Sequence, residues 1–78
     1  MRNTYDRDTD AVYIQLVDEI GNTYGGVKKT YACDPIAVDG MINLDFDLDG
    51  RLLGIEILDA SAMLPAEFLQ EIEGDATT

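Results

Sequence analysis

Two stretches near the middle of the chain alternate strictly between apolar and polar residues on either side of a tight turn. In the first, Ile42, Leu44 and Phe46 occupy every second position, and in the second the apolar positions are Leu53, Ile55 and Ile57. Successive side chains of a β-strand point to opposite faces, so a period of two predicts two strands that each bury one face. Between them, Asp47-Leu48-Asp49-Gly50 has residues that favour chain reversal. The segment 41–58 is therefore predicted to form a β-hairpin.

Three more segments have the composition of strands, at residues 1–5, 11–16 and 27–38. In the segment 11–16 the apolar residues again share one face. The segment 27–38 begins with Lys28 and Lys29, and lysines on an edge strand discourage pairing with other chains. Pro35 lacks an amide hydrogen, so it is expected to end this strand or to lie at an outward-facing bulge. Asp39-Gly40 is a signal for a two-residue hairpin turn before Met41.

The C-terminal part of the chain has the pattern of an amphipathic helix. Leu64, Phe68 and Ile72 recur every four residues, Pro65 suits the first helical turn, and Gly74 is expected to end the helix. The predicted fold class is therefore α+β: an antiparallel meander of four to five strands with one C-terminal helix packed on one face. The 78 residues are expected to form a single domain, with an ordered core over about 1–73 and a frayed tail at 74–78.

The charge balance restricts the classes of partner. The chain has 16 acidic residues, 5 basic residues and no histidine, giving a net charge of −11. A nucleic-acid binder needs a cationic face, and anionic membranes repel acidic proteins, so neither is expected as a partner. Cationic partners such as a small basic protein are favoured, although the charge also serves solubility alone. Without a membrane-length apolar stretch, and with Cys33 as the single cysteine, the expected compartment is the cytoplasm.

The sequence lacks the residue combinations that most catalytic sites use. Without histidine, a serine or cysteine nucleophile lacks its usual base, and zinc lacks a ligand set. The acidic cluster Asp6, Asp8 and Asp10 is expected to stabilise a turn through side-chain hydrogen bonds, because nothing marks one carboxyl as buried and raised in pKa. We therefore expect no enzymatic activity, no catalytic residues and no cofactor.

The hairpin also matches the spacing of an EF-hand calcium loop, from Asp45 through Asp47, Asp49 and Gly50 to Glu56. An EF-hand needs a helix on each side of its loop, whereas both flanks here have the period of strands. On an extended hairpin, Glu56 would lie roughly 20 Å from the turn, at about 3.3 Å per residue. An acidic hairpin tip is the expected structure, and Asp45, Asp47 and Asp49 are weak candidate ligands for a divalent cation.

Two longer stretches resemble a known family. Residues 5–16 have a Tyr-Asp…Asp-Ala-hydrophobic-Tyr-Ile opening, and residues 42–61 close with Asp-Gly-Arg-Leu-Leu-Gly-Ile-Glu-Ile-Leu-Asp-Ala-Ser. They resemble the small prokaryotic domain-of-unknown-function family 2283. The resemblance implies a short antiparallel sheet with a C-terminal helix. It also implies an antitoxin-like role, because family members are often encoded beside a small protein that looks like a ribonuclease toxin. The motif positions, which have no assigned role, are Asp6, Asp10, Tyr13, Gly50, Gly54, Glu56 and Asp59.

Two hypotheses of function follow. A single helix cannot cover both faces of the sheet, and an uncovered face carrying Tyr13, Leu52 and Leu58 would be an apolar patch typical of an interface. The first hypothesis is therefore a protein–protein interaction module that forms a homodimer or binds a basic protein in an antitoxin-like manner. The alternative is a weak divalent-cation-binding module at the acidic hairpin Asp45–Asp49.

Overall fold

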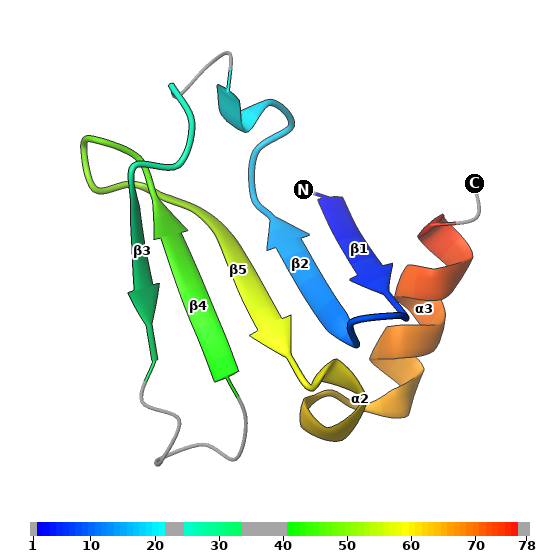
Figure 1. Cartoon of the computed structure of the whole chain (residues 1–78). Coiled ribbons are helices and arrows are strands. Elements are labelled where there is room, and N and C mark those ends of the chain that lie inside the picture. Colours follow the sequence, from blue (N-terminus) through cyan, green and yellow to red (C-terminus); the bar gives the residue numbers. More distant parts are fainter. Residues whose placement is uncertain (1, 22–24, 34–40, 77–78) are drawn as a thin grey trace.

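The computed structural model describes residues 2–21, 25–33 and 41–76, and these form one five-stranded sheet followed by two helices (Figure 1). The predicted turn at Asp39-Gly40, the position of Pro35 and the end of the segment 27–38 lie outside the described residues. No helix among the described residues is long and apolar enough to cross a membrane. The elements are β1 (Arg2–Asp6), β2 (Ala11–Gln15), β3 (Lys29–Ala32), β4 (Met41–Phe46), β5 (Leu52–Leu58), α2 (Ala60–Met63) and α3 (Ala66–Ala76).

All strand pairs are antiparallel, so the α+β class and the predicted 41–58 hairpin are confirmed. The strand order is β1-β2-β5-β4-β3, and the prediction of a simple meander is therefore wrong. β5 lies between β2 and β4 because its apolar positions match both neighbours: Ile57 pairs with Val12 and with Ile42. The lysine-bearing β3 is left at the edge, as its sequence predicts.

Two helices follow the sheet, not one. The short α2 begins after Asp59, which has the left-handed backbone conformation (φ 56°) and so turns the chain sharply out of β5. Pro65 directly precedes α3. The prediction that Gly74 ends this helix is wrong, because α3 continues to Ala76. A glycine inside a helix costs only about 1 kcal/mol relative to alanine, which neighbouring turns can offset.

The hydrophobic core lies where α2 and α3 meet the β1, β2 and β5 end of the sheet. Val12, Ile57, Ala60 and Ile72 are buried there and form one cluster. Val12 and Ile57 come from positions that the period of two assigns to the inward face, and Ile72 comes from the period of four of α3. Partly buried residues surround this cluster, among them Tyr5, Ile14, Ile55, Phe68 and Leu69.

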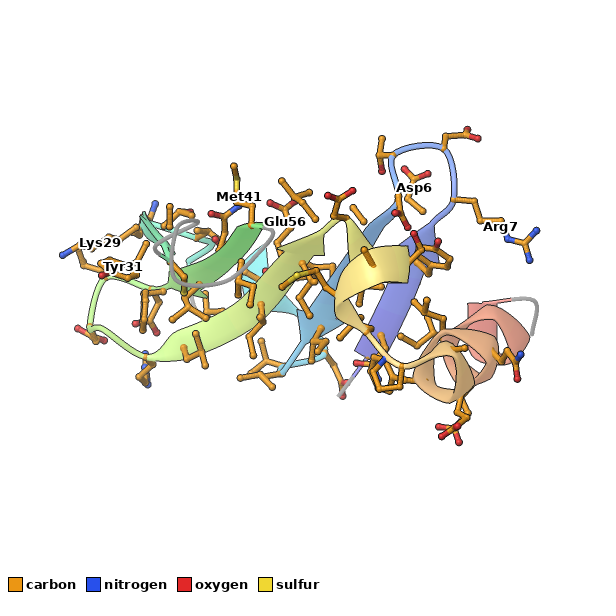
Figure 2. All side chains as sticks on the ribbon, turned by 90° about the horizontal axis from the view of Figure 1, so that it is seen from below. Asp6, Arg7, Lys29, Tyr31, Met41 and Glu56 are labelled. Carbon is orange, nitrogen blue, oxygen red and sulfur yellow. The ribbon has the colours of Figure 1, made fainter. Side chains whose placement is uncertain are left out.

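Seen edge-on, the sheet has two different faces (Figure 2). Both helices lie on one side, which we call the helix face, and Met41, Glu56 and Asp6 point to the other side, which we call the polar face. The helices pack mainly against β1 and β5. Lys29 and Tyr31 lie at the end of the sheet farthest from α3, where no described helix covers β4 or β3.

Candidate functional site

Tyr13 is the centre of a hydrogen-bond network on the polar face. Its hydroxyl donates to Asp45 Oδ2 at 2.8 Å, and the Thr30 hydroxyl donates to Asp45 Oδ1 at 2.7 Å. The phenol ring lies against Gly54, where a Cβ would come within 2.8 Å of the ring atom Cε2. Partial burial, the hydrogen bond to Asp45 and the charges of Asp45 and Glu56 raise the pKa of Tyr13 to about 12. Tyr13 is therefore a neutral donor at physiological pH.

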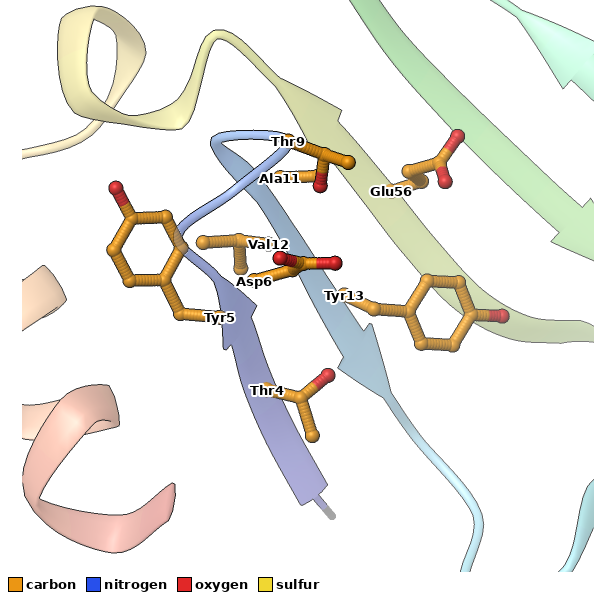
Figure 3. A pocket seen from close by; sticks show the side chains of 8 residues that line it. All are labelled: Thr4, Tyr5, Asp6, Thr9, Ala11, Val12, Tyr13 and Glu56. Carbon is orange, nitrogen blue, oxygen red and sulfur yellow. The ribbon is translucent and has the colours of Figure 1, made fainter. Parts of the chain in front are cut away.

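A shallow pocket of about 280 Å³ opens beside this network (Figure 3). Two carboxylates line it, from Asp6 at the end of β1 and Glu56 on β5, together with Thr4, Thr9 and the ring of Tyr13. β2 separates β1 from β5, so the two carboxylates stand on strands about 10 Å apart, at roughly 4.8 Å per strand spacing. Asp6 is also offset from Glu56 by two residues along the strands, because Asp6 pairs through Ala11 with Leu58. The two carboxylates are thus too far apart to hold one metal ion together, and their combined charge favours a cationic side chain in the pocket.

Glu56 and Asp6 each have an additional contact. The Asn43 side-chain amide donates to Glu56 Oε1 at 2.9 Å across the β4–β5 pair. Asp6 Oδ1 accepts the Asp8 amide hydrogen at 3.0 Å, which is the turn-stabilising bond expected for this acidic cluster. Both side chains also line the pocket, so their charges act on a ligand that enters it.

Asp10 fastens the β1–β2 turn to the start of α2. Its carboxylate accepts hydrogen bonds from the Tyr5 hydroxyl at 2.7 Å, the Ser61 hydroxyl at 2.6 Å and the Ser61 amide at 3.0 Å. The Ser61 hydroxyl, followed by that of Tyr5, lowers the pKa of Asp10. Asp10 itself has the left-handed conformation (φ 53°), and its carbonyl accepts the Ala60 amide hydrogen. This motif position therefore holds the fold together.

Asp47 is buried and organises the β4–β5 turn. Its Oδ1 accepts the amide hydrogens of Asp49 and Arg51 at 2.9 Å each, and its Oδ2 accepts the Arg51 Nε hydrogen at 2.7 Å. These bonds from Arg51 lower the pKa of Asp47, despite the opposing effect of burial. Gly50 completes the turn with φ 84°, a conformation that glycine adopts without strain.

The three weak cation candidates are used in different ways. Asp47 is engaged within the turn, Asp49 pairs with Arg51 Nη2 at 3.2 Å, and Asp45 binds Tyr13 and Thr30. Within the described ranges, no three His, Cys, Asp or Glu side chains gather closely enough to hold a metal ion. Strands, not helices, flank the loop. The cation-binding hypothesis therefore stays a prediction for solution measurements.

An apolar surface remains open on the helix face at the β3 end. We call it the open half-face and define it by Lys29, Tyr31, Leu44 and Phe46. Tyr31 pairs with Leu44, which pairs with Ile55, so these three share the helix face. Tyr31 is 59% exposed. Lys29, Tyr31 and Phe46 also line a cavity of about 290 Å³ at the rim of this surface.

The apolar patch expected at Tyr13, Leu52 and Leu58 stays a prediction. These side chains are partly exposed, as Leu44 and Phe46 are, and Tyr13 belongs to a polar network. Tyr31, which sequence reasoning did not select, is more exposed and lies on the helix face. The period of two puts Lys29 and Tyr31 on one face of their strand, but it does not tell which strands a helix covers.

Comparison with known proteins gives one informative result. No curated protein and no solved structure matches the chain significantly. The family described as a protein of unknown function, DUF2283, matches over residues 2–61. This span contains all five strands and the seven motif positions, and it ends within α2 and before α3. Because the match covers well over half of the sequence, the chain belongs to the DUF2283 family.

Proposed function

We propose that this protein is a protein–protein interaction module that binds its partner through the open half-face. The observation that carries the proposal is the position of the helices: they cover the β1 and β5 region, and none of the described helices lies over the β3–β4 end of the sheet. Tyr31, Leu44 and Phe46 belong to these two strands and point to the helix face. Clustered apolar side chains on the surface of a small protein mark interaction sites, since their burial against a partner is favourable.

The overall dimensions support a missing covering layer. The chain exposes 5305 Å², whereas the size scaling of monomeric proteins gives about 4700 Å² for 8.6 kDa. Its radius of gyration is 13.0 Å, against about 11.5 Å for a compact chain of this length.

The test uses two substitutions in the same edge strand. Tyr31→Asp puts a charge on the open half-face, and Ala32→Asp puts the same charge on the polar face, because strand neighbours point to opposite sides. Both residues are exposed, so both variants are expected to fold. We expect Tyr31→Asp to abolish self-association or association with an identified partner, and Ala32→Asp to preserve it. A wild-type protein that stays monomeric and whose identified complexes survive Tyr31→Asp would disprove the proposal.

A second candidate function is suggested by the pocket on the polar face. Asp6 and Glu56 flank a space that fits a lysine or arginine side chain, and the net charge of −11 attracts basic proteins. Such binding agrees with the antitoxin-like role that the family resemblance implies. We place this association in the cytoplasm, where the lone Cys33 thiol remains reduced.

The second candidate is tested with neutral, nearly isosteric replacements. The double variant Asp6→Asn and Glu56→Gln is expected to weaken binding to a purified basic partner at least tenfold and to flatten its salt dependence. The control is Glu67→Gln with Glu71→Gln, which removes two charges from α3 and leaves the pocket intact. Equal losses in both double variants would mean that net charge alone drives the association.

A further inference from the structure

We infer that the partner of the open half-face is a second copy of this chain, related by a two-fold axis that runs parallel to the strands. In this dimer the two open half-faces pack against each other, and α3 of each protomer lies beside β3 of the other. The inference rests on the proposed function, because it names the occupant of the same surface. Three features of the chain support it: its thickness, the size of its layers and the placement of its charges.

The thickness of the chain is that of an unfinished domain. Its principal extents are 36 × 34 × 18 Å, so one dimension is about half of the other two. The helices fill the second layer of this slab only at the β1 end, so the partner's sheet can fill the same layer beside α3. This arrangement covers Tyr31, Leu44 and Phe46 without another kind of partner and without a further layer.

A helix and a sheet that pack on the same face take up layers of similar thickness. Face-to-face sheets pack about 10 Å apart, and a helix with its side chains is about 10–12 Å wide. The helix that covers the β1 end of one protomer therefore occupies the same layer as the partner's sheet. A two-fold axis parallel to the strands reverses the order of strands in the second copy. It thus brings the partner's β3 edge next to α3.

The charges select this axis over the other in-plane choice. Lys29 projects from β3 at the rim of the open half-face, and Glu67 and Glu71 are exposed on α3. Figure 1 shows the C-terminal end of α3 and the beginning of β3 at the same end of the sheet. Rotation about an axis parallel to the strands leaves each residue at the same height along the strands. Lys29 of one protomer therefore meets the C-terminal half of the partner's α3. Both Glu71 and the negative end of the helix dipole attract it there.

An axis perpendicular to the strands gives the opposite result. It would stack α3 of one copy against α3 of the other, so that Glu67 and Glu71 would face their own counterparts and repel. It would also leave both β3 edges open to solvent, where an unpaired edge invites non-specific strand pairing. The parallel axis therefore removes one unfavourable contact and protects one exposed edge.

Salt dependence separates a second copy from a basic partner. Two chains of charge −11 repel at long range, and salt screens this repulsion over about 8–10 Å. Self-association through an apolar surface is therefore expected to strengthen when salt rises from about 20 to about 300 mM. Binding of a basic protein is expected to weaken over the same range. Sedimentation velocity of the full chain measures the self-association directly.

The arrangement itself is tested by charge reversal. Lys29→Glu and Glu71→Lys are each expected to weaken the dimer about tenfold, since each replaces two attractive contacts by repulsive ones. The double variant exchanges the two charges and is expected to return the dissociation constant to within about threefold of wild type. Tyr31→Asp should give monomers and Ala32→Asp should remain dimeric. Circular dichroism of every variant confirms the fold.

Cross-linking provides an independent readout. Lys28 and Lys29 are the only lysines in the chain, so a zero-length carbodiimide reagent forms few side-chain amide links. In a mixture of isotopically heavy and light chains, we expect mixed-label links from these lysines to Glu67 or Glu71. If the wild type is monomeric at all salt concentrations and Tyr31→Asp abolishes an identified hetero-complex, this inference is wrong and the proposed function stands.

If the wild type forms a dimer that Tyr31→Asp does not weaken, both the inference and the proposed function are wrong. If the double charge reversal does not restore the dimer, the proposed two-fold axis is wrong.

Discussion

Substitution of Gly54 by alanine offers a sharp test of the polar face. Gly54 has no left-handed backbone conformation to explain a glycine, and in most strands alanine would be equally acceptable. What requires glycine here is the ring of Tyr13, which occupies the space that a Cβ would need. Alanine must therefore displace the ring and break the hydrogen bond from the Tyr13 hydroxyl to Asp45.

The expected loss follows from two opposing effects. A hydrogen bond to a charged group contributes about 1.5–3 kcal/mol, and partial exposure places this one at the lower end. Replacing glycine by alanine restricts the unfolded chain and returns about 0.4–1 kcal/mol. Since the ring must also leave its packing site, the net loss is about 1–2 kcal/mol. At about 4–8 °C per kcal/mol, the melting temperature falls by roughly 10 °C.

The decisive experiment repeats the substitution in a Tyr13→Ala background. With the ring removed, only the effect on the unfolded chain remains, so Gly54→Ala should now raise the melting temperature by a few degrees. Gly50→Ala is the control. It strains a left-handed turn position far from the ring, and its cost should be equal in both backgrounds. A destabilisation by Gly54→Ala that is as large without Tyr13 as with it would refute the steric explanation.

Three further predictions concern the ionisable groups. Because the folded state lowers the pKa of Asp47, this group stabilises the protein above the ordinary aspartate pKa near 3.8 and loses its effect as the pH falls through the lower folded value; acid titration of wild type and Asp47→Asn should show curves that converge at low pH. Because the folded state raises the pKa of Tyr13 to about 12, its contribution is complete below pH 10.0 and is lost between there and about 12. Tyr13→Phe should therefore flatten the alkaline loss of stability and remove a phenolate absorbance signal that appears at about pH 12. Melting curves with calcium and with a chelator are expected to coincide, since Asp45 and Asp47 are engaged within the fold; a calcium-dependent rise that Asp47→Asn abolishes would instead establish the cation-binding module.

Local patterns in the sequence predict the strands well, because which face a strand residue points to depends only on its neighbours in the chain. The period of two in segment 41–58 fixes which residues face inward, and the turn residues fix where the chain reverses. Asp10 and Asp47 were recognisable as turn-forming acids from their spacing alone. Their individual hydrogen-bond partners, Ser61 and Arg51, depend on tertiary placement and could be found only in the structure.

The strand order and the position of the open surface were not predictable in the same way. β2, β4 and β5 all have one apolar face, so several pairings satisfy the pattern, and the matching of Ile57 with both Val12 and Ile42 decides among them. Likewise, the amphipathic pattern of α3 shows that it covers something but not how far along the sheet it lies. The surface at Tyr31 follows from that placement alone.

The residues that identify the family explain the fold better than they explain the partner. Asp10 fastens a turn to α2, Gly50 and Asp59 turn the chain, and Gly54 makes room for Tyr13. Each of these roles is complete within one chain and requires no ligand. The open half-face is built instead from β3 and β4 residues that carry no recognisable motif, Tyr31, Leu44 and Phe46 among them. Under the proposed function, such a surface recognises its partner by shape and apolarity and not by a motif, so the partner has to be found by measuring association at this surface.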